Sequence, residues 1–225
     1  MGDLETITVD GRAVRAHRAG PVRAGAPGVV LFHAWWGLND DLRAYADRLG
    51  AAGFAVLAPD LYDGTVVDTV EDAERMATSL DEARSDAIAL AATDTLVERL
   101  GPDARIAAAG FSLGVPWAMW TPAERPGLAA SVAYYGTVSG GLLARGRVPV
   151  LAHFAEADEF EPDENVAAFE DALRAAGREV AVHRYPGTGH WFAEPSRDAF
   201  RPEASELAFA RTVDFLRAQL GDPRA

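Results

Sequence analysis

A serine between two glycines stands where a run of small apolar residues ends. The segment GFSLG, residues 110–114, closes the strand-like stretch 105–111 and precedes a predicted helix. In a Gly-x-Ser-x-Gly turn between a strand and a helix, the glycines leave room for neighbouring elements and the serine hydroxyl projects from the sheet. The pattern predicts a nucleophile at Ser112; the alternative is a serine that caps the following helix.

A serine hydroxyl needs a base before it can attack a carbonyl group, and that base is most often a histidine. His190 lies in the segment YPGTGHWF, residues 185–192, after the last predicted strand. Its two glycines could swing the imidazole over the edge of the sheet, so His190 is the predicted general base. His33 ends another predicted strand and could line the site. The remaining histidines suit packed or surface positions in a hairpin or in strands: His17, His153 and His183.

The imidazole in turn needs a carboxylate that fixes its tautomer and stabilises the imidazolium ion. The segment AEADEFEPDE, residues 155–164, follows a predicted strand, and Asp158 falls at its apex. The neighbouring carboxylates suit solvated loop or helix-start positions better: Glu156, Glu159, Glu161 and Asp163. Should Asp158 not be the acid, Glu156 or Glu159 is the next candidate. The chain order Ser112, Asp158, His190 is that of an α/β-hydrolase triad.

The oxyanion of a tetrahedral intermediate needs two N–H donors. The backbone N–H of Leu113, directly after the nucleophile, is the first candidate. The second should come from the loop HAWWG, residues 33–37, where Trp35 is the best candidate. Both contributions come from the backbone, so the side chains there would shape the pocket instead.

Aromatic side chains cluster on the predicted loops around the serine. The predicted pocket residues are Trp36, Tyr62, Trp117 and Trp191. Each of them could instead be packed in the core. Together they suggest an apolar pocket for the acyl or alcohol part of a substrate, and we expect neutral esters to be preferred over carboxylate-bearing lactones.

Short apolar stretches alternate with longer amphipathic ones, which predicts an α/β fold: a mostly parallel sheet with helices on both faces. A hairpin over 7–19 should turn at Asp10-Gly11. Further strands are predicted at 28–34, 54–60, 105–111, 129–136, 148–154 and 179–185. Helices are predicted at 40–53, in two pieces within 69–100, directly after Ser112, at 162–176 and at 202–220. Residues 62–80 are long enough for a mobile lid.

Length and composition limit the function classes. With 225 residues, 49% hydrophobic and 24% charged, we expect one domain over residues 1–225. The net charge of −13 argues against nucleic acid and anionic membranes as partners. The absence of cysteine excludes disulfides, thiolate metal sites and a cysteine nucleophile. Without a signal-like N-terminus or a membrane-length apolar run, a cytoplasmic protein is expected.

Several segments resemble the dienelactone hydrolase family, in family order over nearly the whole chain. They are HAWWGLND, PDLYDG, GFSLG, YYG, AEADEFEP, GTGHWFAE and ARTVDFL. The resemblance implies an α/β-hydrolase fold and hydrolysis of an ester, lactone or related acyl bond, without a metal or organic cofactor. It also implies that Ser112, Asp158 and His190 form the triad, with Leu113 and Trp35 as oxyanion donors.

Three positions depart from the enzymes that give the family its name. Ser112 replaces their cysteine nucleophile, and Ala34 replaces a glutamate that helps generate the thiolate. These two changes agree, because a serine activated by a histidine has no thiolate to prepare. Glu194 replaces an arginine that holds the substrate carboxylate. Arg75 matches the family's other carboxylate-binding arginine or is a solvated charge, and dienelactone itself is not the expected substrate.

The sequence thus predicts a serine hydrolase that cleaves carboxylic esters or lactones through an acyl-enzyme. Its partner would be a small-molecule substrate, and the chain would act as a monomer or a small homo-oligomer. The alternatives are a thioesterase, a protein that keeps the fold but binds or senses a small molecule, and a relative with an inactive site.

Overall fold

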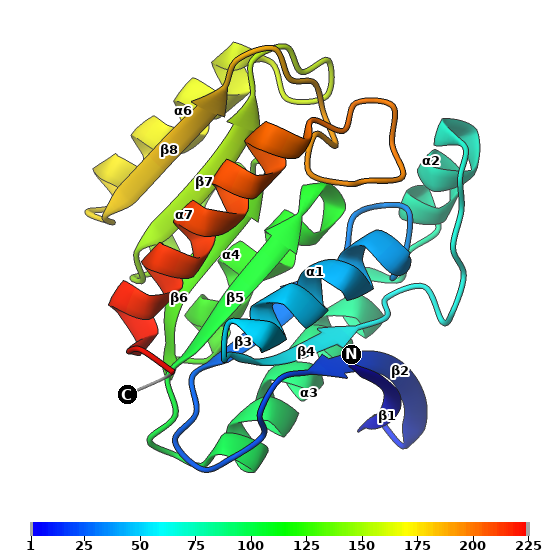
Figure 1. Cartoon of the computed structure of the whole chain (residues 1–225), viewed down its shortest axis with the longest axis vertical. Coiled ribbons are helices and arrows are strands. Elements are labelled where there is room, and N and C mark those ends of the chain that lie inside the picture. Colours follow the sequence, from blue (N-terminus) through cyan, green and yellow to red (C-terminus); the bar gives the residue numbers. More distant parts are fainter. Residues whose placement is uncertain (1, 224–225) are drawn as a thin grey trace.

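The computed structural model describes residues 2–223, whose eight strands form one twisted sheet with helices on both faces (Figure 1). The strands are β1 (Asp3–Val9), β2 (Arg12–Ala19), β3 (Gly28–Phe32), β4 (Ala55–Pro59), β5 (Ile106–Phe111), β6 (Leu128–Tyr134), β7 (Val150–Ala155) and β8 (Val180–Tyr185). The helices are α1 (Asp40–Ala51), α2 (Val70–Thr78), α3 (Glu82–Leu100), α4 (Val115–Glu124), α5 (Leu142–Arg145), α6 (Asp163–Ala175) and α7 (Pro202–Leu220).

The sheet has the order β1-β2-β4-β3-β5-β6-β7-β8. The six strands from β4 to β8 in this order run parallel, and β1 and β2 form an antiparallel extension at one edge. Every residue of β3, β4, β5 and β7 is buried, as expected for strands covered on both faces. The predicted α/β fold with a mostly parallel sheet is confirmed.

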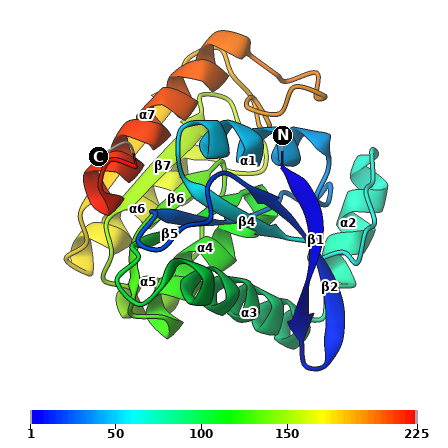
Figure 2. The ribbon, with the colours of Figure 1, turned by 60° about the horizontal axis from the view of Figure 1, so that its bottom comes forward.

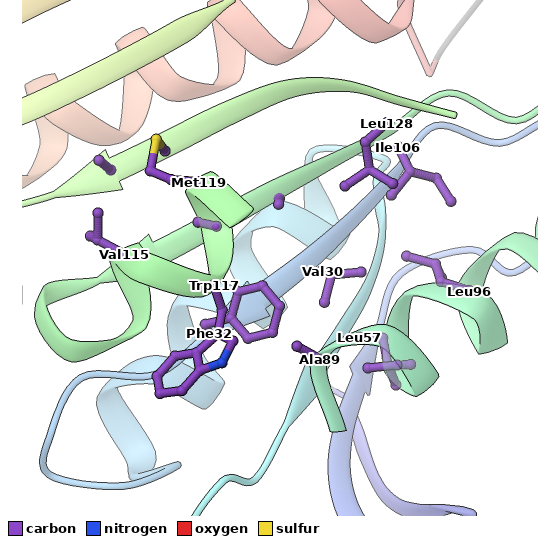
Figure 3. Close-up of a cluster of buried hydrophobic side chains, with 14 of the residues drawn as sticks. Val30, Phe32, Leu57, Ala89, Leu96, Ile106, Val115, Trp117, Met119 and Leu128 are labelled. Carbon is purple, nitrogen blue, oxygen red and sulfur yellow. The ribbon is translucent and has the colours of Figure 1, made fainter. Parts of the chain in front are cut away.

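Two apolar layers hold the helices against the sheet. On one face, α3, α4 and α6 pack on side chains from alternate strand positions, among them Val30, Phe32 and Ile106 (Figure 3). On the other face, α1 and α7 pack on the intervening positions, for example Val29 and Leu31. Figure 2 shows these two helices together on one side of the sheet and α3 and α4 on the other. The layers fix the carboxyl edge of the sheet as a rigid platform.

The element boundaries follow local signals that the sequence carries. Asn39 and Asp81 accept hydrogen bonds from backbone N–H groups in the first turns of α1 and α3, and so end the preceding loops. Asp10 and Gly11 both have positive φ in the two-residue turn between β1 and β2. The predicted pair of helices within 69–100 is confirmed. The four-residue helix α5 was not predicted, because it has too few residues for a helical period.

The segment 62–80 forms a loop followed by α2, which lies at the edge of the molecule (Figure 1). Its movement as a lid stays a prediction. Within residues 2–223, no helix combines the length and the apolar character needed to cross a bilayer.

Candidate active site

The turn between β5 and α4 raises Ser112 above the carboxyl edge of the sheet. Ser112 has a φ of +46°, a conformation that L-residues rarely adopt. A Cβ atom added at Gly114 would lie 2.5 Å from the carbonyl oxygen of Phe32 at the end of β3, and one at Gly110 would collide with the carbonyl of Gly114. Both glycines are therefore required by close backbone approach. This geometry agrees with the predicted strand–turn–helix site.

Ser112, His190 and Asp158 form a continuous hydrogen-bonded chain. Ser112 Oγ lies 2.9 Å from His190 Nε2. His190 Nδ1 lies 2.7 Å and 2.9 Å from Asp158 Oδ2 and Oδ1. The side chains of His190 and Asp158 are only 5% and 2% exposed, so little water competes for these bonds. Three groups that are 32 to 78 residues apart in the chain thus meet at one edge of the sheet.

The backbone around Asp158 holds its carboxylate in place. Oδ1 also accepts the backbone N–H groups of Phe160 and Glu161, each at 3.0 Å. These bonds leave Oδ2 directed at His190. The carboxylate is oriented before any substrate arrives, which is what a group that fixes an imidazole must provide.

Two other carboxylates of the acidic loop, Glu156 and Glu161, bind other partners. Glu156 accepts the backbone N–H of Gly187 at 2.9 Å and so ties the Asp158 loop to the His190 loop. Glu161 accepts both the backbone N–H and the hydroxyl of Thr137. Asp158 is the carboxylate that contacts His190.

Backbone strain is concentrated around these three residues. Among residues 2–223, five non-glycine residues have a positive φ, and Asp10 and Asp63 are acidic residues followed by a glycine. The other three are Ser112, Tyr135 and Trp191, at or beside the triad. Strained backbone persists only where the surrounding structure enforces it, and it clusters at functional sites.

Aromatic rings surround the imidazole of His190. The ring centroids of Tyr135, Phe160 and Trp191 each lie 5.0 Å from that of His190. The ring centroid of Trp35 lies 5.4 Å from that of Phe160 and 6.0 Å from that of Trp191. These contacts bring the predicted oxyanion loop against the loop that carries His190. Sequence reasoning missed Phe160 and Tyr135. Phe160 could have been predicted to lie beside His190, because it stands two residues after Asp158 in the same loop at a strand end.

The two predicted oxyanion donors lie on adjacent strand ends. Leu113 follows Ser112 at the start of the turn into α4, and Trp35 lies in the loop after β3, the strand that pairs with β5. Within residues 2–223, the Trp35 N–H makes no backbone hydrogen bond outside the helices and strands. Binding of an oxyanion by the N–H groups of Leu113 and Trp35 stays a prediction.

Comparison with known proteins identifies the family of the chain. The family model described as "Dienelactone hydrolase family" matches residues 14–220. The chain belongs to the dienelactone hydrolase family. It is 32% identical to the protein usf of Aquifex pyrophilus and 30% identical to a putative carboxymethylenebutenolidase of Aquifex aeolicus, each over 98% of this chain and 100% of the relative. The crystal structure of a putative dienelactone hydrolase from Klebsiella pneumoniae superposes with a TM-score of 0.87 at 22% identity, covering 96% and 98% of the two chains. The chain is thus a hydrolase of the α/β-hydrolase fold.

Glu194, at the position where the resemblance implies an arginine, is buried. Glu194 is 1% exposed, and its Oε1 accepts a hydrogen bond from the Tyr135 hydroxyl at 2.9 Å. Its Oε2 has no hydrogen-bond partner within residues 2–223. Burial raises the pKa of Glu194 to about 8, against the partial compensation of the Tyr135 hydrogen bond. Ala34, where the family resemblance places a glutamate, is fully buried. The buried carboxyl group beside the triad therefore comes from the histidine loop.

Two predicted pocket residues lie elsewhere in the structure. Trp117 is packed on the inner face of α4 beside Phe32 (Figure 3), and its indole N–H donates to Asp86 of α3 at 2.9 Å. α4 turns this side chain toward α3, which agrees with the alternative of core packing, and its contact with a substrate stays a prediction. Arg75 is 66% exposed and pairs with Asp72 of its own helix at 2.8 Å. It fits the alternative of a solvated charge, and no contact supports its binding a substrate.

The other aromatic residues stand in two groups. The ring centroids of Trp36 and Trp191 lie 5.0 Å apart, Arg197 covers the Trp36 ring, and Trp36 is buried. Tyr62 is buried against His33, with 5.0 Å between ring centroids, and burial raises the pKa of its hydroxyl. Contact of these residues with a substrate stays a prediction.

No cluster of metal-ligating side chains occurs within the described part of the chain, residues 2–223.

Proposed function

We propose that this chain hydrolyses carboxylic esters or lactones through a covalent acyl-enzyme on Ser112. The observation that carries the proposal is the hydrogen-bonded chain from Ser112 through His190 to Asp158. The family description and the Aquifex aeolicus relative support an ester or lactone as the bond that is cleaved. Fold alone would not carry this conclusion.

In the first half of the reaction, Ser112 Oγ attacks the substrate carbonyl carbon while His190 Nε2 takes the hydroxyl proton. Asp158 stabilises the resulting imidazolium at Nδ1. The carbonyl oxygen becomes an oxyanion and accepts the N–H groups of Leu113 and Trp35. When the tetrahedral intermediate collapses, the bond to the alcohol breaks, and the imidazolium donates its proton to the leaving oxygen.

In the second half, water attacks the acyl-enzyme and His190 again removes the proton. Collapse of the second intermediate releases the carboxylic acid and returns the proton to Ser112. A lactone follows the same course, but its alcohol and acid remain in one product. Ser112 needs no separate carboxylate for activation, which is consistent with alanine at position 34.

The walls around the triad favour neutral substrates. Trp35, Phe160 and Trp191 form an apolar surface beside His190. Arg75, the other arginine that the sequence offered for binding a carboxylate, pairs with Asp72 of its own helix. We therefore propose neutral, apolar esters as the preferred substrates.

The test is hydrolysis of a neutral p-nitrophenyl ester by the wild type, by Ser112→Ala and by Ser139→Ala. Ser139 is an exposed serine in the loop after β6, so it serves as the matched control. We expect Ser112→Ala to lower kcat by at least about 10³-fold and Ser139→Ala to leave it unchanged. Acid quenching during turnover should trap an acyl group on the peptide that contains Ser112. Undiminished hydrolysis by a folded Ser112→Ala variant would contradict the proposal.

A further inference from the structure

His33 directly follows β3, in the loop that carries Trp35, and it is fully buried. Its Nδ1 lies 2.6 Å from the carbonyl oxygen of Ala34. Its Nε2 lies 3.0 Å from the backbone nitrogen of Leu61, the second residue after β4. No step of the proposed reaction uses this imidazole.

The two backbone partners fix one tautomer of His33. A carbonyl oxygen can only accept a hydrogen bond and a backbone N–H can only donate one. Nδ1 must therefore carry the proton, and Nε2 must be unprotonated. Burial lowers the pKa of His33, although the nearby Asp60 carboxylate, 3.9 Å from Nε2, and the bond to Ala34 act in the opposite direction. The ring stays neutral, with Nδ1–H donating to Ala34.

The carbonyl of Ala34 and the N–H of Trp35 belong to the same peptide group. That group is planar and trans, so its N–H points away from its C=O and a fixed carbonyl also fixes the N–H. Two donors hold the carbonyl, His33 Nδ1 at 2.6 Å and the backbone N–H of Gly37 at 3.2 Å. Hydrogen bonds to a carbonyl also polarise its peptide group and strengthen the N–H as a donor.

The other contacts of His33 make it a firm anchor. Leu61 N–H holds Nε2, and the Tyr62 ring packs edge-on against the imidazole. The backbone N–H of Val67 donates to the carbonyl of Trp36 at 3.1 Å, which joins the same two loops at a second point. The loop after β4 therefore holds the loop after β3 through His33.

We propose that His33 is a positioning residue of the oxyanion hole: it holds the Ala34–Trp35 peptide so that the Trp35 N–H points at the developing oxyanion. The inference rests on the proposed function, because it assigns the Trp35 N–H to the oxyanion. When the donor is misdirected, the transition state loses more stabilisation than the bound substrate does. The loss therefore appears in kcat and not in KM.

Two amide variants separate the two hydrogen bonds of His33. In His33→Asn the side-chain N–H takes the place of Nδ1 and can still donate to Ala34, but nothing reaches Leu61. In His33→Gln the side-chain oxygen takes the place of Nε2 and can still accept from Leu61, but the Ala34 carbonyl loses its side-chain donor and keeps only the Gly37 N–H. Each variant keeps one of the two bonds, so thermal unfolding provides a matched measure of the purely structural effect.

We expect His33→Gln to lower kcat for a neutral ester by about 10- to 100-fold with little change in KM, and His33→Asn to keep kcat within a few-fold of wild type. A second measurement uses a thionoester, in which sulfur, a poor acceptor, replaces the carbonyl oxygen. The ratio of kcat/KM for the ester to that for the thionoester should fall in His33→Gln and stay high in His33→Asn. A merely structural role of His33 would not change this ratio.

Equal kcat values and equal ester-to-thionoester ratios in the two variants would overturn the role of His33. If His33→Gln does not fold, the ¹⁵N chemical shifts of the His33 imidazole in the wild type test the proposal instead, because they identify its tautomer. An Nδ1–H tautomer with a coupling to the Ala34 carbonyl supports the proposal, and an Nε2–H tautomer overturns it. If the wild type shows no turnover that depends on Ser112, the proposed hydrolase function is contradicted. If the wild type is active but the two His33 variants behave alike, only the role of His33 is contradicted.

Discussion

Asp158 binds His190 through its carboxylate, and the consequence at the scale of one residue is a fixed imidazole tautomer. With Nδ1–H directed at Asp158, the lone pair of Nε2 faces the Ser112 hydroxyl. An amide at position 158 could instead donate to Nδ1 and stabilise the other tautomer. His190 would then be unable to accept the serine proton.

We therefore expect Asp158→Asn to lower kcat by about 10⁴-fold while leaving the fold intact. The matched control is Glu156→Gln, which changes a carboxylate two residues away that binds Gly187 and not His190. Steady-state kinetics on a neutral ester and circular dichroism measure the two effects. Near-wild-type activity of Asp158→Asn would mean that another carboxylate acts as the acid.

Glu194 makes the stability of the protein depend on pH. Its pKa rises from 4.5 to about 8 on folding, so the folded state holds a proton that the unfolded state releases between these values. The contribution of Glu194 to the free energy of unfolding is therefore fully present below pH 4.5 and falls as the pH rises toward 8. Above pH 8 the carboxyl is ionised in both states, so the contribution stays at its low value. Asp41 and Arg197 are the charged groups that also act on this carboxyl, with opposite signs.

The variant Glu194→Gln removes this titration while keeping a side chain of similar shape that can accept the Tyr135 hydroxyl. Its free energy of unfolding, relative to wild type, should increase by up to about 1.4 kcal/mol per pH unit between pH 4.5 and 8. Urea denaturation at a series of pH values measures the difference. A difference that is independent of pH would show that Glu194 is ionised in the fold at all these values.

At the scale of elements, the turn between β5 and α4 depends on how closely α4 approaches β3. The methyl group in Gly114→Ala would lie 2.5 Å from the Phe32 carbonyl oxygen and 2.8 Å from that of His33, so the helix must move. We expect a loss of about 1–3 kcal/mol in the free energy of unfolding, together with a loss of activity as Ser112 moves away from His190. Gly127→Ala is the control, since nothing lies within 4 Å of its added Cβ. Equal stabilities and activities for the two variants would contradict this account of the turn.

The elements that support the triad could be predicted because their signals are local. The apolar stretches, the caps and the Gly-x-Ser-x-Gly turn each lie within a short segment. The rule that the carboxyl ends of parallel strands meet at one edge of the sheet then predicts that the three triad residues lie together. Which way a side chain leaves its helix or loop depends on packing between distant segments. For this reason the inward direction of Trp117 and the burial of Glu194, within the loop that carries His190, could not be predicted from their neighbours in sequence.

At the scale of the whole molecule, the charge distribution bears on the choice of substrate. The net charge is −13, and the loop that bears Asp158 carries several further carboxylates. Such a surface repels anionic substrates over a Debye length of about 8 Å at physiological ionic strength. The fold class and the net charge were both accessible from the sequence, whereas the position of each charge relative to the triad needed the structure.

We expect kcat/KM for a neutral aryl ester to exceed that for its carboxylated analogue. Added salt should raise kcat/KM for the anionic ester and leave the neutral one nearly unchanged, because screening affects only the charged substrate. Initial rates at 10 and 500 mM salt measure both effects. A preference for the carboxylated ester would contradict the neutral pocket.

The most direct test of the account is intact-protein mass spectrometry after exposure to a fluorophosphonate. The phosphorus atom forms a bond to an activated serine oxygen and expels fluoride, so the mass gain reports activation without any assumption about the natural substrate. We expect a single adduct on the wild type and on Ser139→Ala, and none on Ser112→Ala. A folded wild type that gains no adduct, or an adduct that persists in Ser112→Ala, would contradict Ser112 as the activated nucleophile.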